Sequence, residues 1–331
     1  MTRLPDPVEV PCPLCGCTQA HTLYWTTDYL FGISDHRFGV KRCDDCGAGY
    51  LSPRPTVESI ADYYPEAFYW SWEGADGKLD WPTIVTKRMP QLRAKARWLD
   101  GIPPGRLLDI GAQKGEFLWF MQQKGWTVEG VELDQKVPNP AHLPIRYGDF
   151  LAMEFGDRRY DAITFWAVLE HVYEPHRFFA KAATLLQPGG HLIALVTNLN
   201  SIQARYYQAD DFPRHLTLFT RSAIRRLCST EGLTLDRLVT DQKIFAGTLN
   251  GGLLYMAKRA LGYAAPEALA EWKQLDDPDL FWCKWRGTAS VWVRMASHLD
   301  RLLTQPVELL LDRLGCGFIL TFSARRDAKK D

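Results

Sequence analysis

Two pairs of cysteines near the start of the chain have the spacing of metal ligands. Each pair is followed by glycine, in CPLCG at 12–16 and CDDCG at 43–47. Two such turns can bring four thiolates to one Zn²⁺ ion, and a site with four protein ligands is structural because no position stays open for catalysis. Two disulfides are the alternative, but a reducing cytosol disfavours them. The sequence therefore predicts a structural zinc site with ligands Cys12, Cys15, Cys43 and Cys46.

The spacing between the two pairs is wider than in the commonest zinc sites of this type. The intervening residues 21–42, HTLYWTTDYLFGISDHRFGVKR, have the pattern of a hairpin that would fill the longer span. Cys17 lies beside the first pair and is a possible substitute ligand. The remaining cysteines are interpreted as buried or free thiols; they are Cys228, Cys283 and Cys316.

A second chemically suited group follows an apolar strand in LLDIGAQKGEF, 107–117. Asp109 stands near the end of the strand, Gly111 and Gly115 bracket a turn, and apolar residues then recur at helical spacing. Glycines let a ligand approach the backbone, and the N–H groups of the following helix point at it. The dinucleotide fingerprint has the spacing G-x-G-x-x-G. The glycine spacing here differs from it, so a nicotinamide-dependent oxidoreductase is disfavoured.

Four later segments extend this pattern in order: GVELD at 130–134, GDF at 148–150, YDAITFWAVLEHV at 160–172 and LLQPGGHLIALVTN at 185–198. Together with the glycine loop they resemble the motifs of class I S-adenosylmethionine-dependent methyltransferases, of the type 23-like kind with an N-terminal zinc ribbon. Gln113 stands where the first family motif has its middle glycine. We expect the Gln113 backbone to keep a negative φ and its side chain to point away from the cofactor.

The resemblance implies how S-adenosylmethionine would be held. Glu132 would accept hydrogen bonds from both ribose hydroxyls, a role that suits a carboxylate because it has two acceptor oxygens and no donor. Asp149 would lie beside the adenine amino group, and Trp166 would form the floor of the pocket or plain core. Strand-end acids can also be simple turn residues. The implied cofactor-binding residues are Asp109, Gly111, Gly115, Glu132, Leu133, Asp149, Phe150 and Trp166.

Two histidines are candidate catalytic residues. A hydroxyl or carbon acid must lose a proton when it is methylated, and histidine titrates close to working pH. His171 follows an apolar strand, at the edge where open α/β sheets bind ligands. His215, in DFPRHLTLF at 211–219, lies in the loop after the next strand. We predict that one of them is the general base; packing or substrate orientation is the alternative for each.

The composition bounds the functions that fit the chain. Lys plus Arg and Asp plus Glu both total 39, so no net field favours nucleic acid, and no nucleic-acid partner is expected. Neither a signal-peptide core nor an apolar run long enough to cross a membrane is present, which predicts a cytoplasmic protein. The predicted activity is methyl transfer to an oxygen or carbon of a small molecule: a sugar, a polysaccharide precursor or a natural product. The alternatives are an RNA methyltransferase that binds RNA through its zinc ribbon and a non-catalytic scaffold with a vestigial cofactor site.

Strands alternate with helical or loop segments from 106 to 197, which predicts crossover connections and a parallel sheet. The fold class is α/β: a Rossmann-like seven-stranded class I methyltransferase sheet with an N-terminal zinc ribbon and a helical insertion before the last strand. The insertion packs on the sheet, forms a homodimer interface or contacts a membrane surface. The predicted division is 1–52 zinc-ribbon module, 53–104 connecting helices and possible lid, 105–240 methyltransferase core, 241–316 helical insertion, and 317–331 last strand and basic tail. Pro90 is expected to break or start the helix predicted over 83–102.

Overall fold

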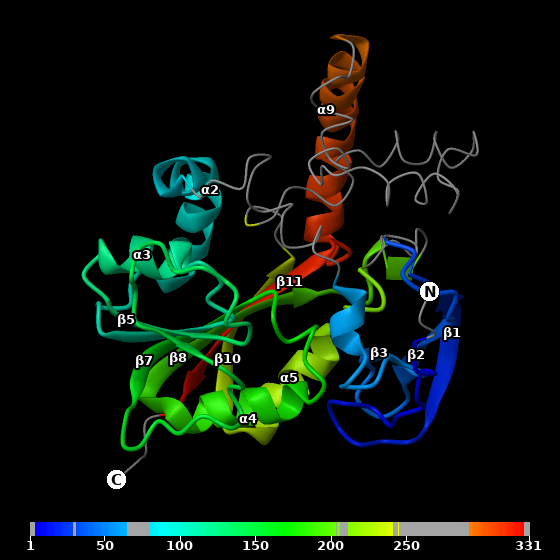
Figure 1. Cartoon of the computed structure of the whole chain (residues 1–331), viewed down its shortest axis with the longest axis horizontal. Helices are drawn as coiled ribbons and strands as arrows, with labels where there is room; N and C mark the ends of the chain where they lie inside the picture. Colours follow the sequence, from blue (N-terminus) through cyan, green and yellow to red (C-terminus); the bar gives the residue numbers. More distant parts are fainter. Residues whose placement is uncertain are drawn as a thin grey trace.

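The larger of two β-sheets forms the centre of the molecule (Figure 1). The computed structural model describes residues 4–28, 31–64, 80–202, 204–205, 211–240, 244 and 291–327. The sheet has seven strands, in the order β10 (Leu233–Thr240), β11 (Ile319–Arg326), β8 (Leu186–Thr197), β7 (Tyr160–Trp166), β4 (Arg106–Ile110), β5 (Thr127–Glu132) and β6 (Ile145–Tyr147). Strand β11 is antiparallel to both of its neighbours, whereas β8, β7, β4, β5 and β6 are parallel. The predicted α/β fold with a seven-stranded sheet is therefore confirmed.

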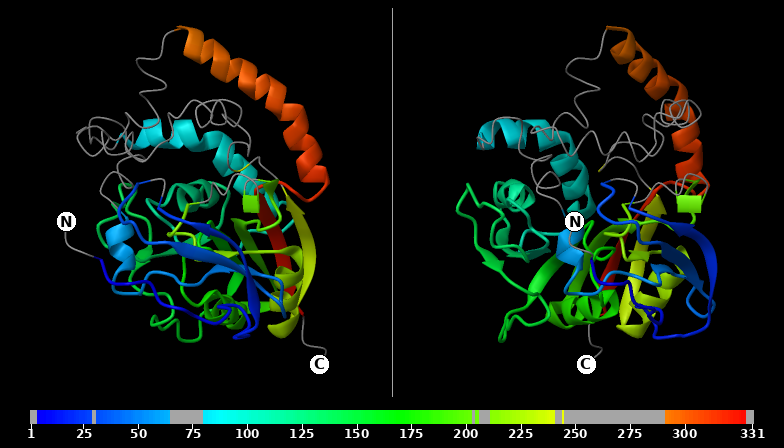
Figure 2. Two further views of the ribbon diagram at one scale, coloured as in Figure 1. Left: turned by 90° about the vertical axis from the view of Figure 1, so that its right-hand side faces the viewer. Right: turned by 45° about the vertical axis from the view of Figure 1, so that its right-hand side comes forward.

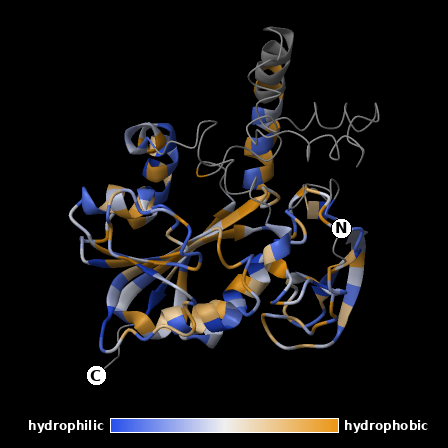
Figure 3. Cartoon of the chain, in the orientation of Figure 1, coloured by the Kyte–Doolittle hydropathy of each residue, from blue (hydrophilic) through white to orange (hydrophobic). Residues whose placement is uncertain are grey.

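Helices cover both faces of this sheet, whose central strands are rich in hydrophobic residues (Figure 3). Along β8, Ile193 packs with α2 (Trp81–Ala96), η2 (Arg97–Leu99) and α3 (Glu116–Gln122). The next residue, Ala194, packs on the other face with α4 (Pro175–Leu185) and α5 (Arg221–Thr230). This alternation is the two-residue period of a strand buried on both faces.

Helix α2 continues through Pro90, so the expected break at this residue is wrong. Proline removes one intrahelical hydrogen bond. Val85 on one side of Pro90 and Leu92 and Ala94 on the other are buried in the cluster that α2 shares with α3. Packing on both sides of the proline therefore holds the helix together.

The strand order places a ligand crevice at the centre of the sheet. From β4 the chain proceeds through β5 to β6 on one side, and it then crosses to β7 and β8 on the other. In open α/β sheets, ligands bind at such a reversal, beyond the carboxyl ends of the strands. The crevice therefore lies where β4 ends at Ile110 and β7 ends at Trp166.

A second sheet lies beside the first and combines distant parts of the chain (Figure 2). Its order is β1 (Ala20–Thr26), β2 (Phe38–Cys43), β3 (Gly49–Leu51) and β9 (Thr217–Leu218). Strands β1 and β2 pair antiparallel as the predicted hairpin. Strand β9 pairs with β3 although it comes from the loop after β8, a pairing that no local pattern predicted. We call residues 4–64, which include the short helix η1 (Ile60–Tyr63), the N-terminal module.

Helix α9 (Val291–Arg313) immediately precedes β11 and projects from the body of the molecule (Figure 1). It lies within the predicted helical insertion; residues 241–243 and 245–290 of that insertion, and residues 65–79 of the possible lid, lie outside the described residues. Several leucines of α9 are exposed, among them Leu302 at 67%. Leu314, just beyond the end of the helix, is 66% exposed. Within the described ranges, no helix combines the length and apolarity needed to cross a membrane.

Candidate functional site

The four predicted zinc ligands come together in the N-terminal module. Their Sγ atoms all lie within 4.8 Å of one another. The Cys12 and Cys46 sulfurs are 3.6 Å apart, and those of Cys15 and Cys43 are 3.5 Å apart. A tetrahedron with Zn–S bonds of about 2.3 Å has sulfur–sulfur edges of about 3.8 Å. The arrangement therefore fits a structural zinc ion, although the ion itself stays a prediction; Cys17 contacts the Gln19 carbonyl instead, with its sulfur 3.6 Å from that oxygen.

Glycines make the two cysteine turns possible. Gly16 has φ +72° and Gly47 has φ +76°, a left-handed conformation that glycine adopts without steric cost. The Gly16 N–H donates to the Cys12 carbonyl at 2.8 Å, and the Gly47 N–H donates to the Cys43 carbonyl at 3.1 Å. Each turn thus folds back on its first cysteine and directs both of its thiols to one point.

The glycine loop after β4 is shaped by its close neighbours. Gly111 has φ +76° and Gly115 has φ +86°. A Cβ at Gly111 would lie 2.4 Å from Cγ2 of Val168, and one at Gly115 would lie 2.6 Å from Cδ1 of Leu143. Both positions therefore require glycine, because side chains pack directly against the backbone there.

The expectation that Gln113 keeps a negative φ is wrong, because its φ is +49°. A non-glycine residue in this region is uncommon. The Gln113 N–H donates to Oε2 of Glu132 at 2.8 Å, and this bond links the loop to the end of β5. The left-handed backbone lets the N–H reach the carboxylate, so the hydrogen bond offsets the conformational cost.

Glu132 ends β5 and faces the glycine loop. Its Oε1 accepts from the N–H groups of Leu133 at 2.8 Å and Asp134 at 3.3 Å, in addition to the bond from Gln113 to Oε2. Burial raises the pKa of Glu132, whereas these N–H donors act in the opposite direction. Oε1 thus already accepts two bonds, and Oε2 can accept one more. The Leu133 side chain beside it is 72% exposed.

Asp109 lies inside β4, below the loop, and is only 2% exposed. Its Oδ1 accepts a hydrogen bond from the Thr164 hydroxyl at 2.5 Å. Burial raises the pKa of Asp109 to about 7, while the nearby charge of Lys95 acts to lower it. Burial likewise lowers the pKa of Lys95 to about 8, with Asp109 opposing the shift.

Lys95 was not among the residues that the sequence patterns indicated. Its Nζ lies 5.4 Å from the ring centre of Trp166 and 5.8 Å from that of Phe117. The available signal is its position in the chain, three residues after Leu92 and four before Leu99, on the buried face of α2 and η2. A lysine on an apolar helix face indicates a charged partner inside.

Trp166 and Phe150 are buried, whereas Asp149 is exposed. Trp166 packs edge-on against Phe117, with ring centres 5.3 Å apart, and its Nε1–H has no partner among the described groups. A buried donor needs an acceptor, which a bound cofactor can supply. Phe150 packs in the core with three other phenylalanine rings, and the Asp149 carboxylate accepts from the Leu151 N–H at 2.9 Å.

The two candidate histidines meet at the same edge of the sheet. The ring centres of His171 and His215 are 4.5 Å apart. The Glu170 carbonyl accepts from the N–H groups of Leu216 at 2.7 Å and Thr217 at 3.1 Å, and these bonds bring the second loop to the first. The structure thus brings together two histidines that the sequence predicted only to lie at the same edge of the sheet; their catalytic role stays a prediction.

The surroundings of His171 define which of its nitrogens can accept a proton. Its Nδ1 lies 3.2 Å from the Arg214 carbonyl and 3.2 Å from the Tyr64 hydroxyl. A carbonyl oxygen only accepts, whereas the Tyr64 hydroxyl can donate or accept. The Arg214 contact therefore favours hydrogen on Nδ1, with the Tyr64 hydroxyl as a second acceptor and the lone pair on Nε2. Burial, together with His215, lowers the pKa of His171 to about 3, which keeps the ring neutral.

A carboxylate lies beside these rings. One ligand atom each from Glu170, His171 and His215 can be chosen so that all lie within 4.8 Å of one another. A carboxylate with two imidazoles is also a donor set for divalent metals. The motif LEHV contains the first two members, but the third depends on the folding of a later loop.

Comparison with known proteins places this geometry in a family. Residues 84–238 match the model of a methyltransferase-domain family. The ubiquinone biosynthesis O-methyltransferase of Alkalilimnicola ehrlichii is 30% identical over 32% of this chain and 47% of its own length. The protein of the same name from Cupriavidus pinatubonensis is 27% identical over 43% of this chain and 69% of its own length. The chain thus spans about half the length of the first of these relatives.

Among solved structures, the magnesium protoporphyrin IX methyltransferase of Synechocystis PCC 6803 superposes with a TM-score of 0.43. It has 19% identity and covers 57% of this chain and 95% of its own. The family match, the curated relatives and the motif order agree. Residues 84–238 therefore form a methyltransferase domain.

Proposed function

We propose that this methyltransferase domain methylates an oxygen or carbon of a small-molecule acceptor. One observation carries the proposal: the glycine loop with Glu132 and the His171–His215 pair follow strands on the two sides of the central crevice. Curated relatives named O-methyltransferases support an oxygen acceptor. The predicted acceptors, namely a sugar, a polysaccharide precursor or a natural product, are part of this proposal.

The residues present fit S-adenosylmethionine. Glu132 offers an acceptor position on Oε2 for a ribose hydroxyl, the loop from Gly111 to Gly115 would contribute backbone N–H groups, and Trp166 offers an unpaired buried donor. When bound, this cofactor supplies an electrophilic sulfonium methyl group. Lys95 and the buried Asp109 would lie beneath the loop near the methionine end. Asp149, with Phe150 next to it in the chain, would lie beside adenine.

Nε2 of His171 or a nitrogen of His215 would take the proton of the acceptor oxygen or carbon. The bound cofactor would supply the methyl group, with the electron pair of the broken carbon–sulfur bond left on its sulfur. Holding the acceptor in line with the methyl group can supply several kcal/mol of the barrier reduction. The neutral state of His171 keeps its lone pair available at neutral pH.

The proposal also includes a structural zinc ion, which Cys12, Cys15, Cys43 and Cys46 of the N-terminal module would bind. The ion would add to the small apolar core in which Phe38, Val40 and Leu51 of the module are buried. The proposed domains of the chain are a zinc-ribbon module at 1–52, connecting helices at 53–104, a core at 105–240, an insertion at 241–316 and a final strand region at 317–331.

Two measurements test this function. Calorimetry should show binding of S-adenosylhomocysteine to the full chain, and the chain with methyl-labelled S-adenosylmethionine should label one small molecule in fractionated cell extract. NADH serves as the control ligand and should give no heat. Absence of heat with S-adenosylhomocysteine would reduce the domain to a non-catalytic scaffold, and label in RNA alone would exclude the small-molecule acceptor.

A further inference from the structure

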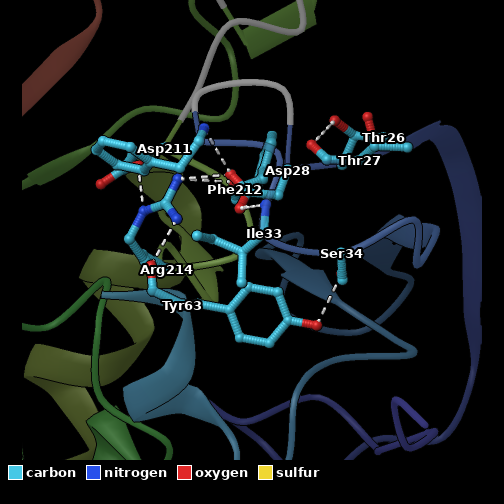
Figure 4. Close-up of polar contacts among 10 residues, drawn as sticks. Thr26, Thr27, Asp28, Ile33, Ser34, Tyr63, Asp211, Phe212 and Arg214 are labelled. Carbon is cyan, nitrogen blue, oxygen red and sulfur yellow. Dashed lines mark hydrogen bonds and ion pairs between the residues drawn. The ribbon is translucent and has the colours of Figure 1, made fainter. Parts of the chain in front are cut away.

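Arg214 is a fully buried arginine next to His215, and its guanidinium joins three segments that are distant in sequence (Figure 4). Its Nε donates to Oδ1 of Asp211 at 2.6 Å, and its Nη2 donates to Oδ1 of Asp28 at 3.1 Å. Its Nη1 donates to the Tyr63 carbonyl at 2.8 Å. The guanidinium thus connects the 211–215 loop to two parts of the N-terminal module.

Asp28 is itself held rigidly. Its side chain is 0% exposed, and its two oxygens accept from the N–H groups of Phe31 at 3.2 Å and Ile33 at 3.0 Å. The Phe31 ring lies against the guanidinium, with the Arg214 Cζ 4.6 Å from the ring centre. Because a planar guanidinium presents several donors in fixed directions, these contacts fix both the position and the orientation of Arg214.

The opposite end of the same residue contacts the candidate base. The Arg214 carbonyl lies 3.2 Å from Nδ1 of His171, and Tyr64, whose neighbour Tyr63 accepts from the guanidinium, places its hydroxyl 3.2 Å from the same nitrogen. Both groups that contact Nδ1 are therefore positioned by one guanidinium. A bond on one imidazole nitrogen determines which tautomer is present and what the other nitrogen can do.

Burial of this charged group requires a reason beyond stability. Buried ion pairs are often no more stabilising than packed apolar residues, because desolvation offsets their attraction. An apolar residue in place of Arg214 would fill space without connecting Asp28, Asp211 and Tyr63. The specific property of the arginine is the geometry that it imposes on the 211–215 loop.

We infer that Arg214, held by Asp28 of the N-terminal module, is a positioning residue that fixes the Nδ1–H tautomer of His171 and directs its Nε2 toward the acceptor. The inference rests on the proposed function for the role of Nε2 in catalysis. It extends that function by giving the N-terminal module a part in the acceptor site. The module would thus define the geometry of the base in addition to providing a folded segment at the start of the chain.

The first test uses the unaltered, zinc-loaded chain labelled with ¹⁵N-histidine. Long-range proton–nitrogen spectra distinguish a protonated from an unprotonated ring nitrogen, and His171→Gln identifies the His171 signals among the eight histidines. We expect one neutral tautomer, with hydrogen on Nδ1, at neutral pH. A His171 signal from the Nε2–H tautomer, or from an equal mixture, would overturn the inference without any further variant.

The second test weakens the network in two ways. Asp28→Asn keeps an acceptor for only one of the Phe31 and Ile33 N–H groups, and it removes the charge that holds Arg214. Arg214→Lys keeps the charge but cannot reach its three partners at once. In both variants we expect mixed tautomers of His171 and roughly tenfold to hundredfold less methyl label in the cell-extract assay. The affinity for S-adenosylhomocysteine should stay within about twofold, because the cofactor contacts are made by other residues.

A matched control is the exposed ion pair between Arg226 on α5 and Asp45 of the module, whose nitrogen and oxygen are 2.6 Å apart. Arg226→Gln breaks a link between the same two parts of the chain and should leave His171 and the labelling rate unchanged. If Arg214→Lys fails to fold, the tautomer of His171 in Asp28→Asn alone tests the inference. A folded Asp28→Asn protein with the original His171 tautomer would overturn the inference. If the unaltered chain does not bind S-adenosylhomocysteine, the proposed function is wrong instead.

Discussion

The two sides of the crevice are built in opposite ways. The cofactor side, with Glu132 and the loop from Gly111 to Gly115, comes from one short stretch of chain between β4 and the end of β5. The acceptor side joins His171, Arg214 and Tyr64 from segments separated by more than forty residues, one of them in the N-terminal module. Local sequence thus specifies the proposed cofactor side, while tertiary packing specifies the proposed acceptor side.

The largest expected effect on the comparison of the two sides comes from removal of the proposed zinc ion. We expect Cys43→Ser to lose zinc and to unfold the N-terminal module, because structural zinc contributes about 10 kcal/mol or more to the folding of small domains. Elemental analysis and hydrogen exchange over residues 38–51 measure both effects. Cys17→Ser, a nearby thiol outside the cluster, should retain one zinc per chain. Retention of zinc by Cys43→Ser would contradict the ligand set, and two zinc ions per chain would point to the Glu170–His171–His215 group as a second metal site.

Substitution of the histidines tests the acceptor side alone. Loss of a general base lowers turnover by about 10²- to 10⁴-fold, so either His171→Ala or His215→Ala should lower methyl labelling by that factor. Calorimetry should show unchanged affinity for S-adenosylhomocysteine in both proteins. Full turnover in both single variants would show that neither ring accepts the proton.

On the cofactor side, Asp109 makes stability depend on pH. The native carboxyl keeps its proton up to a pKa of about 7, whereas the unfolded one loses it near its ordinary value of 3.8. The native state therefore binds more protons in this interval, and the contribution of Asp109 to the free energy of unfolding falls as pH rises from about 4 to about 7. Asp109→Asn should remove this dependence, a relative gain of about 4 kcal/mol above pH 7.

Urea unfolding at several pH values, without cofactor, measures the difference between the unaltered chain and Asp109→Asn. Asp157→Asn, at an exposed position after β6, is the control and should follow the unaltered chain. Parallel pH curves for Asp109→Asn and the unaltered chain would mean that the buried carboxyl stays ionised.

Glu132 gives the next smaller effect. Glu132→Gln keeps the shape of the side chain but replaces one acceptor oxygen with a donor, so S-adenosylhomocysteine should bind with a loss of about 3 kcal/mol, or roughly a hundredfold. Glu129→Gln is the matched control on the same strand, because Glu129 bonds Arg158 and Tyr160 instead. Equal affinities in the two variants would remove Glu132 from the ribose site.

Gln113→Gly should have the smallest effect and tests the departure from the family motif. Glycine relieves the φ of +49°. It also increases the entropy of the unfolded chain, so the net change in stability should stay below about 1 kcal/mol. Thermal unfolding measures it, and calorimetry should show cofactor affinity retained. A large loss of affinity would mean that the Gln113 side chain itself contacts the cofactor.

These contrasts explain which features of the structure could be predicted from the sequence. The sheet, the glycine loop and the position of Glu132 could be predicted because each depends on residues close together in the chain. The positive φ of Gln113 was missed because it depends on a hydrogen bond to another strand, and Lys95 was missed because its partner Asp109 lies in a different element. For Arg214 only the contact with Asp211 is local, and its partners Asp28 and Tyr63 come from the first part of the chain, which no local pattern connects to it.

The pairing of β3 with β9 has a consequence during synthesis. The first three strands leave the ribosome early, but the edge of β3 stays unpaired until residues 217–218 emerge, after most of the central strands. Unpaired edges invite association with other chains. This edge is only three residues long and begins with glycine, so the nascent chain exposes little that a neighbouring polypeptide could join while it waits for its own fourth strand.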